Sequence, residues 1–142
     1  MKVVDLNVLL HVVDEGSPHH DTALNWWTSA LTSNDRIGIH WNVAIGFLRV
    51  ATSARVFPNP LTAEQALEVL DAWWQHPNVV VARESDDHWS ILRSLLDESG
   101  TGGNLSSDAH LAAVAVGYGA DLVSFDADFG RFRRVSWERP GR

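Results

Sequence analysis

The chain of 142 residues contains no cysteine. This absence excludes disulfide bonds, zinc sites built from thiolates and a cysteine nucleophile. Long apolar runs are also missing, because no stretch is long enough to cross a bilayer. Asp5 and Asn7 interrupt the apolar residues at the N-terminus, and no small-residue cleavage site follows them. We therefore expect a cytoplasmic protein that does not associate with a membrane.

Positive charge is scarce as well, with 11 Lys and Arg against 18 Asp and Glu and a net charge of −7. This balance argues against broad, sequence-independent binding of nucleic acid, which depends on neutralising many phosphates. Five of the 11 basic residues nevertheless fall within the last twelve positions. They form either a solvated tail or a rim that contacts phosphates beside the acidic turn at Asp126. The candidates for such contacts are Arg131, Arg133 and Arg134.

Several common motifs are absent from the sequence. Gly102 and Gly103 lack the lysine and the spacing of a phosphate-binding loop, and no serine lies in a nucleophile elbow. The segment from Asp126 does not fit a calcium-binding EF-hand, since Gly130 is one place early and the twelfth position is Trp137 instead of glutamate. The seven histidines show no metal-ligand spacing, so we interpret them as surface residues or satisfied polar residues.

Strand-like and helix-like segments alternate along the chain. This alternation predicts an α/β fold with a central, mostly parallel sheet of about five strands, covered by helices on both faces. The length suits a single domain spanning residues 1–142. Ser17, and either Ser106 or Ser107, are expected as helix caps, with Gly100 as one helix stop and Gly117 with Gly119 as another. Strands are expected at 2–6, 36–40, 78–82, 120–125 and 134–137, and helices at 7–14, 18–31, 41–52, 63–76, 86–99 and 108–116.

The stretch 104–130 carries three carboxylates beside the most apolar segment of the chain. Asp108 lies in the first turn of a predicted helix, where the helix dipole favours a negative charge. Residues 109–116 of that helix are apolar almost all round, which predicts that it is buried. Asp126 and Asp128 come just after the following strand. Carboxylates in these places are difficult to explain as solubilising charge alone.

Asp5 is the expected companion of these three aspartates. It follows the first predicted strand, and the carboxyl ends of parallel strands form the edge of an open α/β sheet at which ligands bind. We therefore expect Asp5 to lie close to Asp108, Asp126 and Asp128. Each aspartate alone could be only a helix cap or a turn residue, so the inference rests on their combination in one short domain.

Converging carboxylates repel one another, by roughly 4 kcal/mol for two unit charges about 4 Å apart at an effective dielectric near 20. Such a group is stable only if some members are protonated or a cation lies among them. Oxygen ligands without sulfur favour Mg²⁺ or Mn²⁺, which hold phosphates and activate water, so phosphodiester hydrolysis is the expected chemistry. Asn7 could orient Asp5 and Ser124 could orient Asp126 by hydrogen bonding, or both could be ordinary turn residues.

Four segments together resemble PIN-domain ribonucleases, and most closely VapC-type toxins of toxin–antitoxin pairs. They are V-V-D-L-N-V-L-L at 3–10, F-L-R-V-A-T at 47–52, G-N-L-S-S-D-A-H-L-A-A at 103–113 and S-F-D-A-D-F-G-R-F at 124–132. The resemblance covers essentially the whole chain and implies a three-layer α/β/α sandwich. It also implies a Mg²⁺- or Mn²⁺-dependent endoribonuclease that blocks translation and is silenced by a cognate antitoxin.

The resemblance assigns roles to individual residues. Asp5, Asp108 and Asp126 match the catalytic aspartates that bind the metal, and Asp128 is an additional acidic position of the catalytic set. The three arginines that follow the acidic turn would then contact RNA. One position departs from the family pattern, because PIN domains usually carry a glutamate in the helix that here contains Gly46.

Two other functions stay open at this point. The chain could be a non-catalytic PIN-like protein that binds RNA or an antitoxin without cutting, and Gly46 is the feature that favours this alternative. A phosphatase of the haloacid-dehalogenase type is suggested by the D-x-D pattern after a strand. That family places the pattern at its first strand, however, where this chain reads Asp5-Leu6-Asn7.

Four of the seven tryptophans form adjacent pairs on predicted helices, Trp26-Trp27 and Trp73-Trp74. Adjacent helical residues point about 100° apart, so one member of each pair should reach the flank of its helix. Partly exposed tryptophans favour interfaces, which predicts at least a homodimer. The other interpretation is that all four complete the core.

Overall fold

The computed structural model describes residues 1–100, 103 and 105–142; Gly102 and Asn104, which the sequence assigns to a loop, lie outside the described residues. The strands of the sheet are β1 (Lys2–Val4), β2 (Ile37–His40), β3 (Val79–Ala82), β4 (Asp121–Val123) and β5 (Trp137–Glu138). Their order is β3-β2-β1-β4-β5, and each neighbouring pair is parallel. The predicted α/β class is confirmed, and the sheet is entirely parallel.

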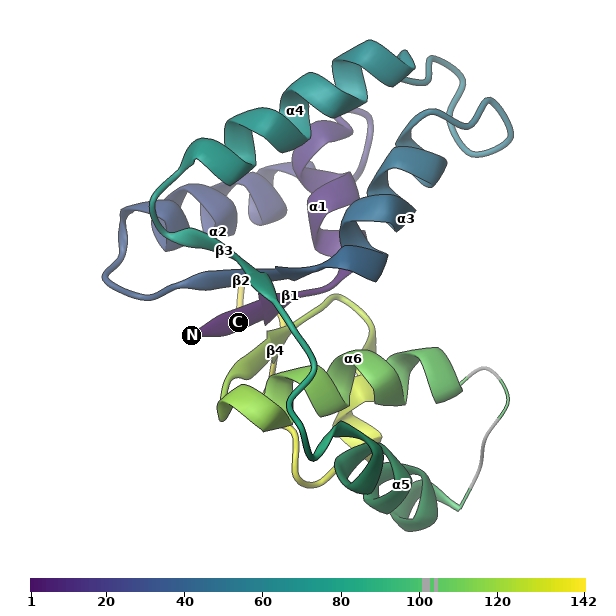
Figure 1. The fold of residues 1–142 in the computed structure, drawn as a ribbon. Helices are drawn as coiled ribbons and strands as arrows, with labels where there is room; N and C mark the ends of the chain where they lie inside the picture. The colour runs from purple at the N-terminus through teal and green to yellow at the C-terminus, as the bar shows by residue number, and fades with distance from the viewer. Residues whose placement is uncertain (101–102, 104) are drawn as a thin grey trace.

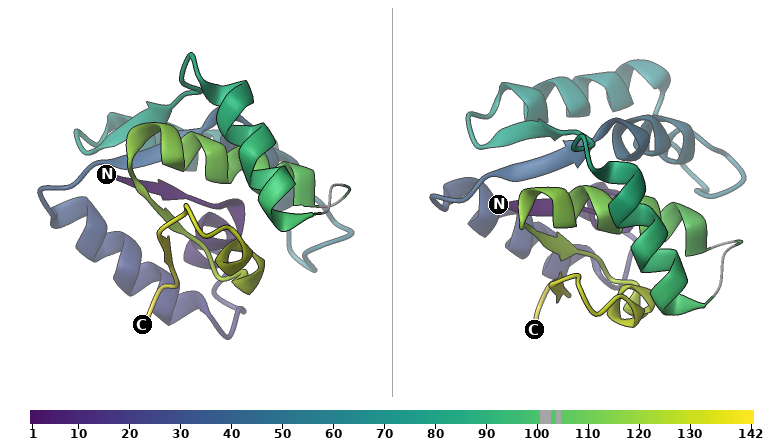
Figure 2. Two further views of the ribbon diagram at one scale, coloured as in Figure 1. Left: turned by 90° about the horizontal axis from the view of Figure 1, so that it is seen from below. Right: turned by 60° about the horizontal axis from the view of Figure 1, so that its bottom comes forward.

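Helices cover both faces of this sheet. Figure 1 shows α1 to α4 on one side and α5 with α6 on the other, which makes the three layers that the resemblance implies. Figure 2 shows α5 and α6 packed side by side. Within the described part of the chain, no helix is both long and apolar enough to cross a membrane. The helices are α1 (Leu6–Val13), α2 (His20–Thr32), α3 (Trp41–Ala51), α4 (Ala63–Gln75), α5 (His88–Ser99), α6 (Leu105–Tyr118) and the short 3₁₀ helix η1 (Ala127–Arg131).

The path of the chain creates a switch point in the sheet between β1 and β4. The chain builds outwards from β1 to β2 and β3, then returns to the other side of β1 to add β4 and β5. Val4 pairs with Val123, and the N–H of Asp5 continues the ladder by donating to the carbonyl oxygen of Val123 at 2.9 Å. Asp5 and the residues after Val123 therefore emerge side by side at the place where open α/β sheets bind ligands.

Helix α6 contacts β1, β4 and α5 through a face of small residues. Ala109, Ala112 and Ala113 are fully buried. The predicted burial of residues 109–116 is confirmed, with only His110 and Val116 partly exposed. Short side chains allow the helix to pack against the sheet without separating the layers, and this packing brings the start of α6 to the carboxyl edge of β1 and β4.

Two helices begin later than the sequence predicts. The helix expected from Ser17 begins at His20, because the Ser17 hydroxyl accepts the N–H of His19 and forms a local turn instead of a cap. The helix expected from Ser85 or the next residue begins at His88, whose N–H donates to the carbonyl oxygen of Ser85 in a turn. In both cases a polar residue that favours caps has formed the turn that precedes the helix.

The boundaries of α6 also differ from the prediction. The helix begins at Leu105, so Ser106 and Ser107 lie in its first turn and do not precede it. Gly117 lies inside the helix, whereas Gly119 has a φ of 61° and follows its last residue. The left-handed conformation that commonly ends a helix is therefore supplied by the second of the two glycines.

The strands are shorter than the apolar runs that predict them. Leu6 belongs to α1 and not to β1, because the side chain of Asp5 caps α1 by accepting the N–H of Leu6. The strand expected at 120–125 covers Asp121–Val123, and the one expected at 134–137 covers Trp137–Glu138. The chain thus leaves the sheet after only two to four residues of each strand.

Gly46 is buried in α3 and faces α1. A Cβ atom at this position would lie 3.0 Å from Cδ2 of Leu6, which is closer than ordinary van der Waals contact. The absence of a side chain at Gly46 therefore permits the close packing of α3 against α1.

We expect Gly46→Ala to lower the free energy of unfolding by about 1 kcal/mol, because the added carbon overpacks the contact with Leu6. In a Leu6→Ala background the same substitution should be neutral or stabilising, since alanine is favoured over glycine inside a helix by about 0.5–1 kcal/mol. Urea unfolding of the four proteins in this double-mutant cycle measures the coupling. Equal effects in the two backgrounds would contradict a packing role for Gly46.

Candidate active site

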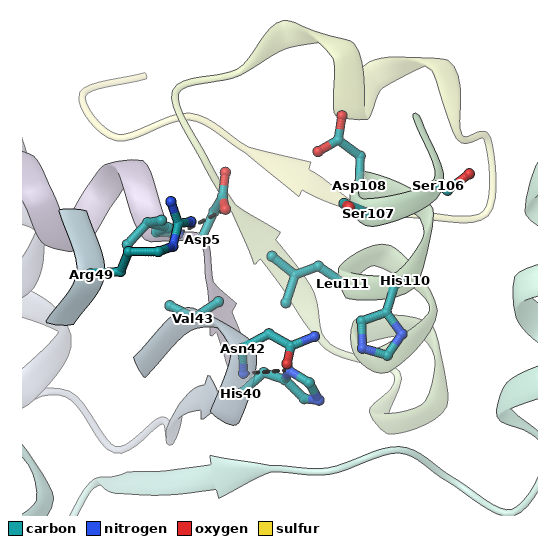
Figure 3. Close-up of a pocket in the computed structure, with 11 residues that line it drawn as sticks. Asp5, His40, Asn42, Val43, Arg49, Ser106, Ser107, Asp108, His110 and Leu111 are labelled. Atoms are coloured by element: carbon teal, nitrogen blue, oxygen red, sulfur yellow. Dashed lines mark hydrogen bonds between the residues drawn. The ribbon is translucent and has the colours of Figure 1, made fainter. Parts of the chain in front are cut away.

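A cavity of about 550 Å³ opens at the carboxyl edge of the sheet, between α3 and α6. In Figure 3 the carboxylates of Asp5 and Asp108 point towards the same space at one end of this cavity. The rings of His40 and His110 lie close together at the other end. Arg49 of α3 also lines the cavity. The switch point predicted to bind a ligand therefore coincides with an open, polar cavity.

Asp5 is held by three hydrogen bonds. Its Oδ1 accepts the N–H of Leu6 at 2.7 Å, and its Oδ2 accepts Asn7 Nδ2 at 2.9 Å and Ser124 Oγ at 2.7 Å. Burial raises the pKa of Asp5, and the charge of Asp126 raises it further, while the hydrogen bonds from Ser124 and Leu6 act in the opposite direction. The carboxylate is thus fixed in orientation although its surroundings disfavour its charge.

Asn7 and Ser124 connect the end of β1 to the end of β4. The Ser124 side chain is fully buried, and its hydroxyl accepts hydrogen bonds from Asn7 Nδ2 and from the N–H of Asp126, both at 3.0 Å. Asn7 Oδ1 accepts the N–H of Phe125 at 3.1 Å. The sequence suggests that Ser124 orients the carboxylate of Asp126 by a hydrogen bond. In the structure the Ser124 hydroxyl instead donates to the carboxylate of Asp5.

The carboxylates of Asp108, Asp126 and Asp128 form an acidic group with oxygens within 4.8 Å of one another, and Asp5 is not a member of this group. Asp126 caps η1 by accepting the N–H of Asp128 at 2.9 Å. Among the described residues, no hydrogen bond reaches the carboxylate of Asp108. Burial raises the pKa of Asp108 to about 6, and the charges of the other three aspartates add to this effect. The charges of the other three predicted aspartates thus all act on the carboxyl of Asp108.

This acidic group has the chemistry of a site for a hard divalent cation. Its donors are carboxylate oxygens without sulfur, which Mg²⁺ and Mn²⁺ prefer. Burial first, and then the charges of the other aspartates, raise the pKa of Asp108, so the surroundings of this carboxyl disfavour its ionised form. A cation among these oxygens would favour the ionised form of each carboxylate.

The three arginines predicted to contact RNA lie in two places, beside the acidic group and beside α5. Arg131 lies beside the group, with its Nε 3.5 Å from Oδ1 of Asp128. Arg133 and Arg134 instead contact side chains of α5. Arg49 also lines the cavity, although no sequence pattern distinguishes it from other polar residues on predicted helices. Arg49 and Arg131 are thus the basic side chains next to the carboxylates within the described part of the chain.

A second polar cluster was not foreseen from the sequence. His40, Glu84 and His110 bring their ligand atoms within 4.8 Å of one another. Both ring nitrogens of His40 have hydrogen-bond partners, as expected of a satisfied polar residue. The three residues come from different parts of the chain, so no regular spacing in the sequence predicts that they cluster. The position of His40 at the end of a predicted strand was the available clue, and it is the same clue that selected Asp5.

The strand order, the helix layers and the acidic switch point define the class of this protein. The chain belongs to the PIN-domain family, whose pattern matches residues 2–135. Within the family it is similar to proteins named as VapC ribonucleases. It is 44% identical over 140 residues to ribonuclease VapC37 of Mycobacterium tuberculosis, covering 99% of this chain and 97% of that protein. It is 39% identical over 142 residues to ribonuclease VapC33 of the same species, covering 100% and 99% of the two chains.

Solved structures agree with this assignment at the level of the fold. The crystal structure of VapC20 of Mycobacterium tuberculosis, described as a toxin that cleaves the sarcin-ricin loop, has a TM-score of 0.70 at 18% identity and covers 96% of this chain and 98% of its own. VapBC2 of Rickettsia felis, solved with a DNA fragment from its promoter, has a TM-score of 0.69 at 18% identity and covers 97% of each chain.

The pKa of Asp108 predicts how stability depends on pH. The pKa of Asp108 is about 6 in the folded protein, above the ordinary value of 3.8. Its protonated form is therefore compatible with the fold at low pH, and the protein loses stability when Asp108 ionises as the pH rises through about 6. Metal-free Asp108→Asn should therefore melt higher than the wild type at about pH 7.5, and the difference should vanish near pH 4. The rise should be a few degrees at most, because solvent screens a partly exposed carboxylate.

Calorimetry in the presence of a chelator measures this difference. Asp71→Asn, an exposed position on α4, is the matched control and should not change the melting temperature at either pH. A lower melting temperature for Asp108→Asn at neutral pH would show that Asp108 is stabilised by its surroundings and not repelled by the other aspartates.

Proposed function

We propose that this protein is a Mg²⁺- or Mn²⁺-dependent endoribonuclease toxin that is inhibited by a cognate antitoxin. We also propose that it acts in the cytoplasm and that residues 1–142 form one domain. The observation that carries the proposal is the convergence of four aspartates at the switch point of a PIN-domain sheet. The identity of 44% to a protein named as a ribonuclease supports it. Membership of the PIN-domain family sets aside a phosphatase of the haloacid-dehalogenase type.

In this proposal Asp5, Asp108 and Asp126 bind the metal, and Asp128 adds negative charge beside them. The ion, when bound, holds a phosphate of the RNA and lowers the pKa of a water molecule. Asn7 and other donors around Asp5 keep that carboxylate in one orientation, as hydrogen bonds do for metal-binding carboxylates. The protein therefore holds the carboxylate of Asp5 in place before an ion binds.

RNA would enter along the cavity that Asp5 and Asp108 share with Arg49. We propose that Arg131 contacts a phosphate next to the acidic group, and that Arg133 and Arg134 extend this contact over α5. The net charge of −7 makes a short segment of RNA a better substrate than a long duplex, because few phosphates can be neutralised.

Asp108→Asn is the sharpest test of the catalytic proposal, because it removes one charge without breaking a hydrogen bond of the described fold. It should reduce Mg²⁺-dependent cleavage of total RNA by about 100-fold or more, since loss of a metal ligand should cost at least as much as loss of a group that orients one. Asp71→Asn should cleave as the wild type does, and a chelator should stop cleavage by both.

The same assay separates the two remaining functions. Wild-type protein that binds RNA but does not cleave it with either Mg²⁺ or Mn²⁺ would favour the non-catalytic alternative suggested by Gly46. Cleavage that persists in Asp108→Asn would remove the acidic group as the site of chemistry.

An antitoxin is the proposed protein partner. An apolar groove between α3 and α4 is lined by Ile45, Leu48 and Leu67, two of which are largely exposed. An apolar segment of the antitoxin could pack there, while an arginine from it could reach the carboxylates and form paired hydrogen bonds with them. Such an arginine would neutralise the same repulsion that the metal neutralises, and so compete with it.

We propose a homodimer, although for a different reason from the tryptophan pairs. As expected, one member of each pair is buried and the other, Trp26 or Trp74, is partly exposed. Trp26, however, donates a hydrogen bond to Glu138 of its own chain, and the ring of Trp74 packs against that of Trp41. Trp89 on α5, by contrast, is 72% exposed. A large exposed indole on a helix suits a buried position at an interface between subunits.

Light scattering at tens of micromolar should accordingly give the mass of a dimer. Trp89→Ala should raise the dissociation constant of that dimer by about tenfold or more, which corresponds to about 1.4 kcal/mol. A monomeric wild type at this concentration would contradict the proposal, and a dimer unaffected by Trp89→Ala would place the interface elsewhere.

A further inference from the structure

A second group of metal-ligating side chains lies at the same edge of the sheet, next to β2 and β3. His40 ends β2, Glu84 follows the end of β3 by two residues, and His110 comes from α6. His40 Nε2 is 2.6 Å and His110 Nε2 is 3.4 Å from the same oxygen, Oε1 of Glu84. Figure 3 shows the two imidazole rings close together at the end of the cavity away from Asp5, and their planes are nearly perpendicular. Three separate elements thus aim their ligand atoms at one point.

The hydrogen bonds around the two rings define where their protons lie. His40 Nδ1 accepts the N–H of Asn42 at 3.1 Å, so the proton of the neutral ring is on Nε2 and is donated to Glu84. His110 Nδ1 is 2.9 Å from Nε2 of His88. His88 Nδ1 is buried and has no hydrogen-bond partner among the residues that the structure describes.

This arrangement prepares His110 to bind an ion. A neutral histidine that coordinates a metal through Nε2 carries its proton on Nδ1 and usually donates that proton to a fixed acceptor. His88 Nε2 is placed to accept it. His88 would then orient the ring of His110 and carry its own proton on Nδ1, which has no hydrogen-bond partner among the described residues.

The ligand atoms select the kind of ion. Two imidazole nitrogens and one carboxylate oxygen favour Zn²⁺ and similar transition ions over Mg²⁺. A tetrahedral zinc with bonds of about 2.0–2.2 Å places its ligand atoms about 3.3 Å apart, and the separation of 3.4 Å between His110 and Glu84 already fits. The Glu84 side chain is 43% exposed, so it can move away from His40 to admit the ion.

We propose that His40, Glu84 and His110 form a binding site for Zn²⁺ or a similar transition-metal ion, separate from the acidic group. An ion there links the end of β2, the segment after β3 and α6. The cluster opens onto the cavity, which leaves a fourth coordination position for water. The proposal does not depend on ribonuclease activity.

Calorimetric titration of tag-free protein with Zn²⁺, in a large excess of Mg²⁺, tests the site. The Mg²⁺ fills oxygen-ligand sites and competes poorly for imidazole, so one equivalent of Zn²⁺ should bind. Glu84→Gln and His110→Gln should each weaken this binding by about tenfold or more. Glu64→Gln, at an exposed position in the first turn of α4, is the matched control and should bind as the wild type does.

NMR of the imidazole nitrogens gives a second readout that needs no substitution. Zn²⁺ should shift the Nε2 resonances of His40 and His110 to metal-bound positions and move the His40 proton from Nε2 to Nδ1, at the expense of the hydrogen bond from Asn42. The ion should also raise the melting temperature, since it binds the native state. Histidine spectra that do not change at saturating Zn²⁺, or equal affinity in the wild type, Glu84→Gln and His110→Gln, would overturn the assignment.

Discussion

Repulsion among carboxylates at the switch point between β1 and β4 is the constraint on which this end of the structure depends. The protein holds the charges together by using them in its own fold. Asp5 caps α1 and Asp126 caps η1, so the hydrogen bonds that begin two helices also orient two members of the acidic group. Asp108 has no such role among the described residues, and its pKa is the one that burial and neighbouring charge raise to about 6. Burial and the charge of Asp126 also raise the pKa of Asp5, so both side chains bear the unfavourable electrostatics, but only Asp5 has hydrogen bonds that oppose it.

Close packing behind the acidic group keeps it in place. The alanines of α6 allow this helix to lie against β1 and β4, and Gly46 allows α3 to approach α1 at Leu6. Both contacts lie directly behind residues of the cavity, since Leu6 follows Asp5 and Asp108 precedes Ala109. The alanines thus set the distance between α6, which carries Asp108, and the strands that precede Asp5 and Asp126, whereas Gly46 sets the distance between α1 and the wall of the cavity in α3. A methylene group added at either place should displace residues of the cavity, because protein interiors are densely packed.

The sequence was sufficient for the sheet, the burial of α6 and the convergence of the aspartates, because these follow from apolar runs and from the shared edge of parallel strands. It was insufficient where a polar residue had two local uses. Ser17 favours a cap by composition but forms a turn, and Ser124 donates to Asp5 across the sheet instead of to its neighbour Asp126. The pairing of His40 with His110 depends on strand order and helix position together, which no local pattern contains.

The two ends of the cavity differ in ligand chemistry more than in shape. Asp5 and Asp108 offer only oxygen, whereas His40 and His110 offer nitrogen. Oxygen ligands do not by themselves exclude transition ions, because affinity for sites with nitrogen or oxygen ligands generally rises from Mn²⁺ to Zn²⁺. Selectivity at the acidic end therefore depends on the geometry of its oxygens and on which ion is available. Imidazole suits Zn²⁺ and carboxylate suits Mg²⁺, so when Zn²⁺ is limiting the proposed site at His40, Glu84 and His110 would take it first, and abundant Mg²⁺ would occupy the carboxylates.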